Sequence, residues 1–256
     1  MNNYETIIVE ESKSTVKIIL NRIDKANAIN NKMSTEIVEV ITSLKDRPDI
    51  RYIVFTGNGS TFSAGADMHE AAEVLENTEN LNSFIHKDQL DRRNFMQLIE
   101  SMEQITIASI NGAAYGAGFA LAMACDFRVM ATSAIICLPE SERGMFFSAG
   151  CTPRLVSMIG YTKSMELLLL SQKVDADESL RIGLVTSIAE ENQLNQQVEK
   201  IIKQLEKSTP EALKTQKRLI QSSVCVNNQA TSLEANSLEL LMLKNNVTGQ
   251  MKQFKK

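Results

Sequence analysis

Two runs of small residues follow predicted strands, and their backbones could bind the oxygen of a polarised carbonyl group. The first run, SAGAD, lies within residues 62–67, and the second, YGAG, lies within residues 111–118. Small side chains let a ligand approach the backbone, and the second run leads into a predicted helix whose first N–H groups have no intrahelical acceptor. Two such N–H groups that converge on one point would form an oxyanion hole. Tight packing is the commoner reason for either run alone, but their joint occurrence at two strand ends favours a site.

A glutamate that could carry protons comes later in the chain. Glu140 ends the sequence LPE and precedes a small-residue stretch at 148–150. Among 31 acidic residues, a single glutamate is ordinarily a solvated surface group. Phe119, Ala120 and the sequence MFF at 145–147 predict an apolar pocket wall. Such a wall would raise the pKa of Glu140 by desolvation and make it a better base near neutral pH.

The elements that must position these residues alternate between strand and helix patterns in the first half of the chain. β-branched runs predict strands, and apolar residues at helical spacing predict helices between them, with Asn30 or Asn31 available to cap the first helix. The expected elements are a hairpin of strands at 6–9 and 16–20, a helix at 37–44, strands at 52–55, 105–110 and 127–130, and helices at 90–102 and 115–125. Strands that alternate with helices predict βαβ units and a largely parallel sheet.

After about Gly160 the pattern becomes helical. Ser208 or Thr209 would cap a helix that starts with Pro210, a residue favoured in a first turn. Helices are expected at 163–170, 176–182, 190–205, 210–222 and 232–243. We therefore predict an α/β core with an α-helical C-terminal appendage, divided as residues 1–190 and 191–256.

Composition argues against several classes of protein. The chain has 256 residues, 43% of them hydrophobic, and a net charge of −4, which gives no reason to expect nucleic acid as a partner. Four cysteines without CxxC spacing and two scattered histidines predict no metal site. The first residues lack the pattern of a secretory signal, and no apolar stretch approaches the roughly 20 residues of a membrane span. We expect a soluble, cytoplasmic protein with no membrane partner.

Four ordered segments carry a wider resemblance: FSAGADMHE, INGAAYGAGFALAMACDFRVMA, LPESERG and AGCTPRL. In order and spacing they resemble the crotonase (enoyl-CoA hydratase/isomerase) superfamily, over about residues 16–188, and they are specific for the superfamily rather than for one reaction. The resemblance implies an α/β fold, a crotonase-like spiral of βαβ units with a C-terminal α-helical trimerisation region, in a homotrimer or a dimer of trimers. It also implies an acyl-CoA or carrier-protein thioester as substrate, with no cofactor beyond the coenzyme A of that substrate.

By motif position, the resemblance implies that the backbone N–H groups of Ala66 and Ala117 form the oxyanion hole, and that Glu140 is the principal acid/base. It places the contacts with the substrate and its coenzyme A at Lys25, Ala26, Ala64, Ala66, Asp67, Met68, Gly116 and Ala117. Three further lysines could contact the 3′-phosphate, although solvated charge is an equally good explanation for each: Lys252, Lys255 and Lys256.

The departure from the family pattern is Ala120, where hydratases of this family usually carry a glutamate. Two carboxylates make hydration straightforward, because one orients water while the other transfers a proton. One base suffices to move a proton from C2 to C4, so we favour a Δ3,Δ2-enoyl-CoA isomerase with Glu140 as its single acid/base. An enoyl-CoA hydratase is a serious alternative, and a decarboxylase or C–C bond-forming enzyme comes third. An alternative of another class is a non-catalytic acyl-CoA- or RNA-binding paralogue.

Overall fold

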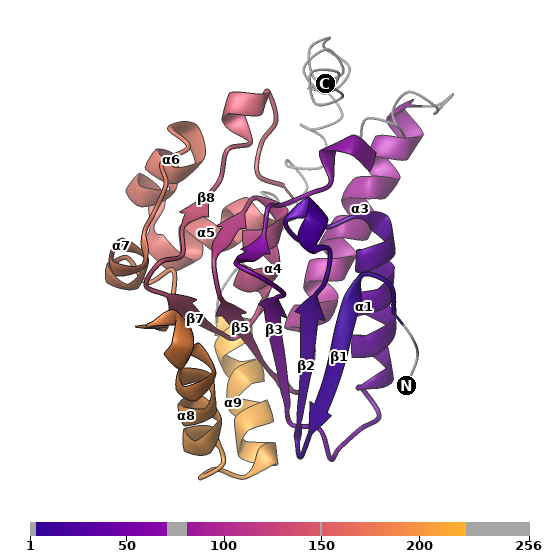
Figure 1. Ribbon diagram of the computed structural model, residues 1–256, viewed down its shortest axis with the longest axis vertical. Helices are drawn as coiled ribbons and strands as arrows, with labels where there is room; N and C mark the ends of the chain where they lie inside the picture. Colours follow the sequence, from indigo (N-terminus) through magenta and orange to yellow (C-terminus); the bar gives the residue numbers. More distant parts are fainter. Residues whose placement is uncertain (1–3, 71–80, 149, 224–256) are drawn as a thin grey trace.

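The computed structural model describes residues 4–70, 81–148 and 150–223. Its centre is a six-stranded sheet in the order β1-β2-β3-β5-β7-β9 (Figure 1). β1 and β2 are antiparallel, and every later pair of neighbours is parallel, as the sequence predicted. The strands are β1 (Ile7–Ser12), β2 (Thr15–Leu20), β3 (Tyr52–Gly57), β5 (Ile105–Ile110), β7 (Phe127–Ala131) and β9 (Ser187–Ala189).

The middle strands of this sheet are covered on both faces. Every residue of β3 and β5 is buried, which explains why both strands are mostly apolar and carry no charged residue. The predicted strand at 105–110 coincides with β5, and the strand predicted at 52–55 is extended by two residues to Gly57.

A second, parallel sheet of three short strands was not predicted. Its order is β4-β6-β8, and each of its strands follows a strand of the large sheet along the chain. Glycine permits two of the close backbone approaches, because a Cβ atom at Gly57 or Gly112 would overlap the carbonyl oxygen of Thr61 or Ser60. The strands are β4 (Thr61–Ser63), β6 (Ala113–Tyr115) and β8 (Ile136–Cys137). Three successive units thus give one strand to each sheet, which builds the predicted spiral.

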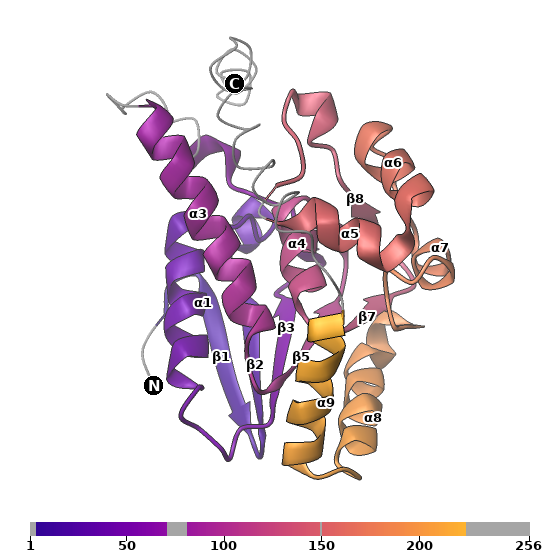
Figure 2. The same ribbon diagram turned by 180° about the vertical axis from the view of Figure 1, so that it is seen from behind.

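Helices pack around the large sheet. α1 and α3 lie side by side on one of its faces, and α8 and α9 lie side by side toward the edge formed by β7 and β9 (Figures 1 and 2). The predicted caps are confirmed: Asn30 Oδ1 accepts from the N–H of Met33 at 2.9 Å, and Thr209 Oγ1 accepts from the N–H of Ala212 at 3.3 Å. The helices are α1 (Asn31–Ser43), α3 (Leu81–Glu100), α4 (Ala117–Ala124), α5 (Cys151–Ile159), α6 (Tyr161–Leu169), α7 (Ala176–Arg181), α8 (Leu194–Leu205) and α9 (Pro210–Ser223).

Most predicted helices are present, with some differences. α5 was not predicted, and the helix expected at 115–125 begins at Ala117 because Tyr115 ends β6. The helix expected at 232–243 lies outside the described residues. The division at residue 190 falls just after β9 and stays a prediction. Within the described ranges, no helix combines the length and the apolar character needed to cross a bilayer.

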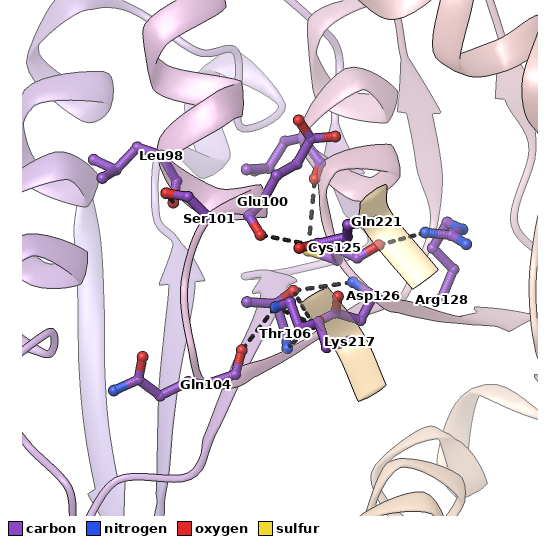
Figure 3. A network of polar contacts seen from close by, with 11 residues as sticks. Leu98, Glu100, Ser101, Gln104, Thr106, Cys125, Asp126, Arg128, Lys217 and Gln221 are labelled. Atoms are coloured by element: carbon purple, nitrogen blue, oxygen red, sulfur yellow. Dashed lines mark hydrogen bonds and ion pairs between the residues drawn. The ribbon is translucent and has the colours of Figure 1, made fainter. Parts of the chain in front are cut away.

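α4 is the central helix of the core and ends at a buried cation. All of its residues after Ala117 are buried, so it has no polar face of the kind that marks a surface helix. Arg128 Nη1 donates to the carbonyl of Cys125, at 2.6 Å, just beyond the C-terminal end of α4, and its Nε donates to the carbonyl of Leu184 at 2.8 Å (Figure 3). A cation at this place is favourable, because the C-terminal end of a helix carries partial negative charge.

A buried lysine attaches α9 to the same region. Lys217 Nζ donates to Asp126 Oδ2 at 2.6 Å and to the carbonyl of Gln104 at 2.9 Å (Figure 3). Asp126 Oδ2 also accepts from the N–H and the hydroxyl of Thr106, at 2.8 and 3.0 Å. Since Thr106 lies in β5 and Asp126 precedes β7, this network joins α9 to the beginnings of two central strands.

Candidate active site

The N–H of Ala66, the first candidate donor of the predicted oxyanion hole, is oriented by a short parallel ladder. Ile29 donates its N–H to the carbonyl of Gly65 at 2.7 Å, and its carbonyl accepts from the N–H of Asp67 at 2.9 Å. Ile29 therefore forms a parallel bridge with the residue between them, Ala66. Successive residues of an extended segment direct their N–H groups to opposite sides. Because Gly65 and Asp67 face Ile29, the N–H of Ala66 faces the other way.

The second donor is the first residue of α4, and it lies close to the first. Gly65 has φ +103°, and a Cβ atom there would lie 3.7 Å from the backbone nitrogen of Ala117. One residue further along α4, a Cβ atom on Gly118 would lie 2.5 Å from Ser63 Cβ. Glycine at this position therefore lets α4 pack against the end of β4. The structure records no backbone acceptor for the N–H groups of Ala66 and Ala117 among the described residues. Two free donors on adjacent backbone segments are what an oxyanion hole requires.

Glu140 lies beside these donors. It immediately precedes the 3₁₀ turn Ser141–Arg143, and a Cβ atom on Gly116 would lie 2.5 Å from Glu140 Oε1. The carboxyl group therefore rests against the backbone of the residue just before Ala117. Within the described part of the chain, Glu140 Oε2 is buried and has no hydrogen-bond partner. The structure thus brings together the three residues that the sequence proposed for catalysis, Ala66, Ala117 and Glu140.

Burial raises the pKa of Glu140 from 4.5 to about 7. A backbone hydrogen bond and the positive charge of Arg143 act in the opposite direction, and desolvation outweighs both. The predicted direction of this pKa shift is confirmed. Of the expected apolar wall, Phe119, Ala120 and Phe147 are buried. A carboxyl group with a pKa near 7 exchanges its proton readily at neutral pH, which suits a general acid/base.

The position of the missing glutamate lies in the first turn of α4. Ala120 donates its N–H to the carbonyl of Gly116 at 2.9 Å, and its methyl group is buried. A methyl group cannot accept a hydrogen bond from water. For the described residues, the structure shows no cluster of three or more histidine, cysteine or acidic side chains that could hold a metal ion.

Most of the residues predicted to bind the substrate and its coenzyme A fall on two loops that touch, and the other two, Gly116 and Ala117, lie at the start of α4. Lys25 is exposed in the 3₁₀ turn Ile23–Lys25, and the carbonyl of Ala26 accepts from the N–H of Ala64 at 2.9 Å. Met68 is partly buried just after the Ala66 loop. Binding by these residues, and by Gly116, stays a prediction. Lys252, Lys255 and Lys256 lie outside the described residues.

Two residues that shape the site were missed by sequence reasoning. Asn27 is fully buried with φ +54°, and its Nδ2 donates to the carbonyls of Asn58 and Thr61 at 2.9 and 2.7 Å. Arg22 pairs with Asp67 at 2.8 Å, so a side chain expected to contact substrate is engaged within the protein. The sequence signal that could have revealed Asn27 is its place in the run NRIDKANAIN, between a predicted strand and a predicted helix. Asparagine is one of the residues that tolerate a left-handed backbone in such a loop.

The raised pKa of Glu140 predicts a pH-dependent effect on stability. The folded-state pKa of about 7 exceeds the ordinary 4.5, so the carboxyl group favours the folded state at low pH and this contribution is lost as the pH rises through 7. Glu140→Gln should therefore be more stable than the wild type at pH 8, by roughly 1–3 kcal/mol, and nearly equal to it at about pH 4, below the ordinary pKa of the carboxyl group. Urea unfolding at both pH values measures this difference. Glu142→Gln, at an exposed neighbouring position, is the control, and an equal gain for Glu140→Gln at both pH values would contradict the shift.

Comparisons with known proteins agree with this geometry. The family model described as enoyl-CoA hydratase/isomerase matches residues 10–254. The crotonyl-CoA hydratase of Syntrophomonas wolfei is 35% identical over 201 residues, which cover 77% of this chain and 74% of that protein. The short-chain-enoyl-CoA hydratase of Clostridium acetobutylicum is 31% identical over 215 residues, covering 84% of this chain and 80% of that protein.

A solved structure gives the same result for the fold. The crystal structure of an enoyl-CoA hydratase from Bacillus anthracis matches with a TM-score of 0.80 and 27% identity, covering 98% of this chain and 96% of that one. All three named proteins are hydratases, so their names do not support the preference for an isomerase. The extent of these matches and the shared fold make the chain a member of the enoyl-CoA hydratase/isomerase family, within the crotonase superfamily.

Proposed function

We propose that this protein moves a proton on an acyl-CoA thioester, with Glu140 as its single acid/base and the N–H groups of Ala66 and Ala117 as its oxyanion hole. The observation that carries the proposal is the placement of a carboxyl group with a pKa of about 7 against Gly116, next to a free helix N-terminus. The names of the relatives support an acyl-CoA substrate. A trimeric assembly, expected from the family, and a cytoplasmic location, expected from the cysteine pattern and the first residues, accompany this proposal.

Isomerisation of a double bond fits one carboxyl group. Ionised Glu140 takes a proton from C2 of a 3-enoyl thioester, and the electron pair of the broken C–H bond moves onto the thioester oxygen as a dienolate. The N–H groups of Ala66 and Ala117 stabilise that negative charge. Protonated Glu140 then returns the proton to C4 while the double bond forms between C2 and C3. The step balances without water or a second acid, and it needs one base that reaches both carbons.

Hydration is the second candidate, and the names of the relatives favour it. In that reaction water adds to C3 of a 2-enoyl thioester while C2 receives a proton. The buried methyl group of Ala120 offers no acceptor for the water. A hydratase built on this site would need Glu140 to take the proton of the water and to supply the proton at C2.

The first experiment compares the two reactions. Purified protein is assayed with a 3-enoyl-CoA and with a 2-enoyl-CoA, and Glu140→Gln and Glu142→Gln are assayed beside it. We expect faster isomerisation than hydration, and a loss of about 100- to 10,000-fold in turnover for Glu140→Gln alone. Because the ionised carboxylate is the base, kcat/KM should rise tenfold per pH unit below about 7 and become constant above it.

Each other outcome of this assay has a definite meaning. Efficient hydration that depends on Glu140 would replace the isomerase by the hydratase. Turnover unchanged in Glu140→Gln would refute the role of this residue. Bound acyl-CoA with no reaction of either substrate would direct attention to decarboxylation, to C–C bond formation or to a carrier-protein thioester.

Restoring a carboxylate at position 120 should change the balance between the two reactions. Ala120→Glu adds an acceptor for water in the first turn of α4, so we expect the ratio of hydration to isomerisation to rise about tenfold or more. Ala120→Gln is the matched control, since it adds the same bulk without the charge. The ratio is measured with both enoyl-CoA substrates, and unfolding in urea checks that the buried position tolerates each side chain. Equal changes in the two variants would show that bulk or the added hydrogen-bond acceptor, and not the negative charge and basicity of the carboxylate, alters the reaction.

The contact between Gly116 and Glu140 should be required for turnover. A methyl group at Gly116 would overlap Glu140 Oε1 and displace the base, so Gly116→Ala should reduce kcat about 100-fold. Gly160→Ala is the matched control: Gly160 also has a positive φ, +78°, but nothing lies within 4 Å of the added atom. Turnover and thermal unfolding are measured for both. A similar loss of turnover in both variants would mean that backbone strain alone is responsible.

A further inference from the structure

We propose that Arg22 and Asp67 are positioning residues that hold the N–H of Ala66 in the oxyanion hole. The inference rests on the proposed function, in which that N–H binds the thioester oxygen. Neither side chain needs to contact the substrate, because both act through the backbone of the Ala66 loop. This assigns to Asp67 a role other than the substrate contact expected from the sequence, and it gives a role to Arg22.

The ion pair joins the two loops that meet at Ala66. Arg22 Nη2 lies 2.8 Å from Asp67 Oδ2, and the two side chains are only 16% and 9% exposed. Arg22 Nη1 donates to the carbonyl of Ala28 at 2.7 Å. One planar guanidinium group therefore links residues 26–29 to the residue that follows Ala66. Its rigid geometry fixes the distance between the two loops, which the flexible chain of a lysine would not do.

The carboxylate of Asp67 also fixes the chain on its other side. Asp67 Oδ1 accepts from the N–H groups of His69 and Glu70, at 3.1 and 3.3 Å. Burial raises the pKa of Asp67, but the hydrogen bonds from Arg22 and from these backbone groups outweigh it and hold the pKa below its usual value. The carboxylate is consequently ionised at neutral pH. It binds Arg22 on one side and the N–H groups of His69 and Glu70 on the other.

A small movement of this loop would affect the transition state more than binding. An oxyanion-hole donor acts at 2.7–3.1 Å from the oxygen, and its bond strengthens as negative charge develops. The ladder to Ile29 sets the side to which Ala66 points, and the ion pair restricts how far that ladder can shift. Loss of the pair should therefore lower kcat, while affinity for a thioester in its ground state changes little.

Three variants test this proposal. Asp67→Asn keeps the size of the side chain and an oxygen that can accept from the N–H groups of His69 and Glu70, but it removes the charge. Arg22→Met removes the guanidinium group and keeps part of the apolar stem. Arg22→Lys is the conservative variant that keeps the charge. Arg47→Met is the control, because Arg47 pairs with Glu11 and Asp49 at the surface. Circular dichroism and urea unfolding define conditions under which each variant is fully folded, and every measurement is made there.

The kinetic result separates positioning from a merely structural role. We expect kcat to fall about 10- to 100-fold in Asp67→Asn and Arg22→Met, with KM and the Kd for butanoyl-CoA changed less than about threefold. Arg22→Lys should recover part of the loss. The double variant that combines Asp67→Asn with Arg22→Met should have a kcat little lower than either single variant, because each single change already removes the same ion pair. A kcat within twofold of the wild type, or a loss confined to KM, would overturn the proposal.

A spectroscopic signature tests the same point without turnover. In wild-type protein, bound butanoyl-CoA should show its thioester carbonyl stretch at a lower frequency than in water, because the oxyanion hole polarises the bond. That shift should become smaller in Asp67→Asn and Arg22→Met, and remain in Arg47→Met. A wild-type shift that is unchanged in both variants overturns the positioning role alone. A shift that shrinks as expected, in a protein that converts neither enoyl-CoA, sustains the positioning role and refutes the proposed reaction. Absence of the wild-type shift overturns both.

Discussion

The site depends on the close approach of two backbone segments, the loop around Ala66 and the first turn of α4. No side chain fits between them, since a Cβ atom at Gly65 would lie 3.0 Å from the carbonyl oxygen of Tyr115, and one at Gly118 would contact Ser63 at 2.5 Å. The glycines thus allow backbone N–H groups from different units of the spiral to lie close together, as the proposed oxyanion hole requires. Glu140 lies against the third glycine of this region, Gly116, so the position of the base is set by the same packing.

The single carboxyl group gives the site a character that the fold does not determine. The spiral and its backbone donors can stabilise a thioester enolate whatever the next step is, and side chains decide how that enolate is used. Burial raises the pKa of Glu140 toward neutrality. Ala120 offers no acceptor for water, so Glu140 is the one candidate acid/base among the described residues that the sequence proposed for this site.

Sequence reasoning predicted the long elements and named three candidate site residues that lie together in the structure, and it missed features that depend on tertiary contacts. β5 was recognised because its six residues include three isoleucines and a threonine, which favour strands, and α1 because a cap precedes an amphipathic pattern. β4, β6 and β8 have two or three residues each, too few to show a period of two. Ala66 and Ala117 were found through motif spacing. The Arg22–Asp67 pair joins residues 45 positions apart, a distance over which local pattern carries no information.

The buried network around Lys217 has a consequence for the C-terminal part of the chain. Detaching α9 would leave Asp126 without its cation in a largely dry setting, and breaking such a pair is strongly unfavourable. α9 is therefore expected to stay attached through the ordinary fluctuations of the protein. The last residue of α9, Ser223, is therefore held at a set position relative to β5 and β7, although it lies more than 90 residues after β7 begins.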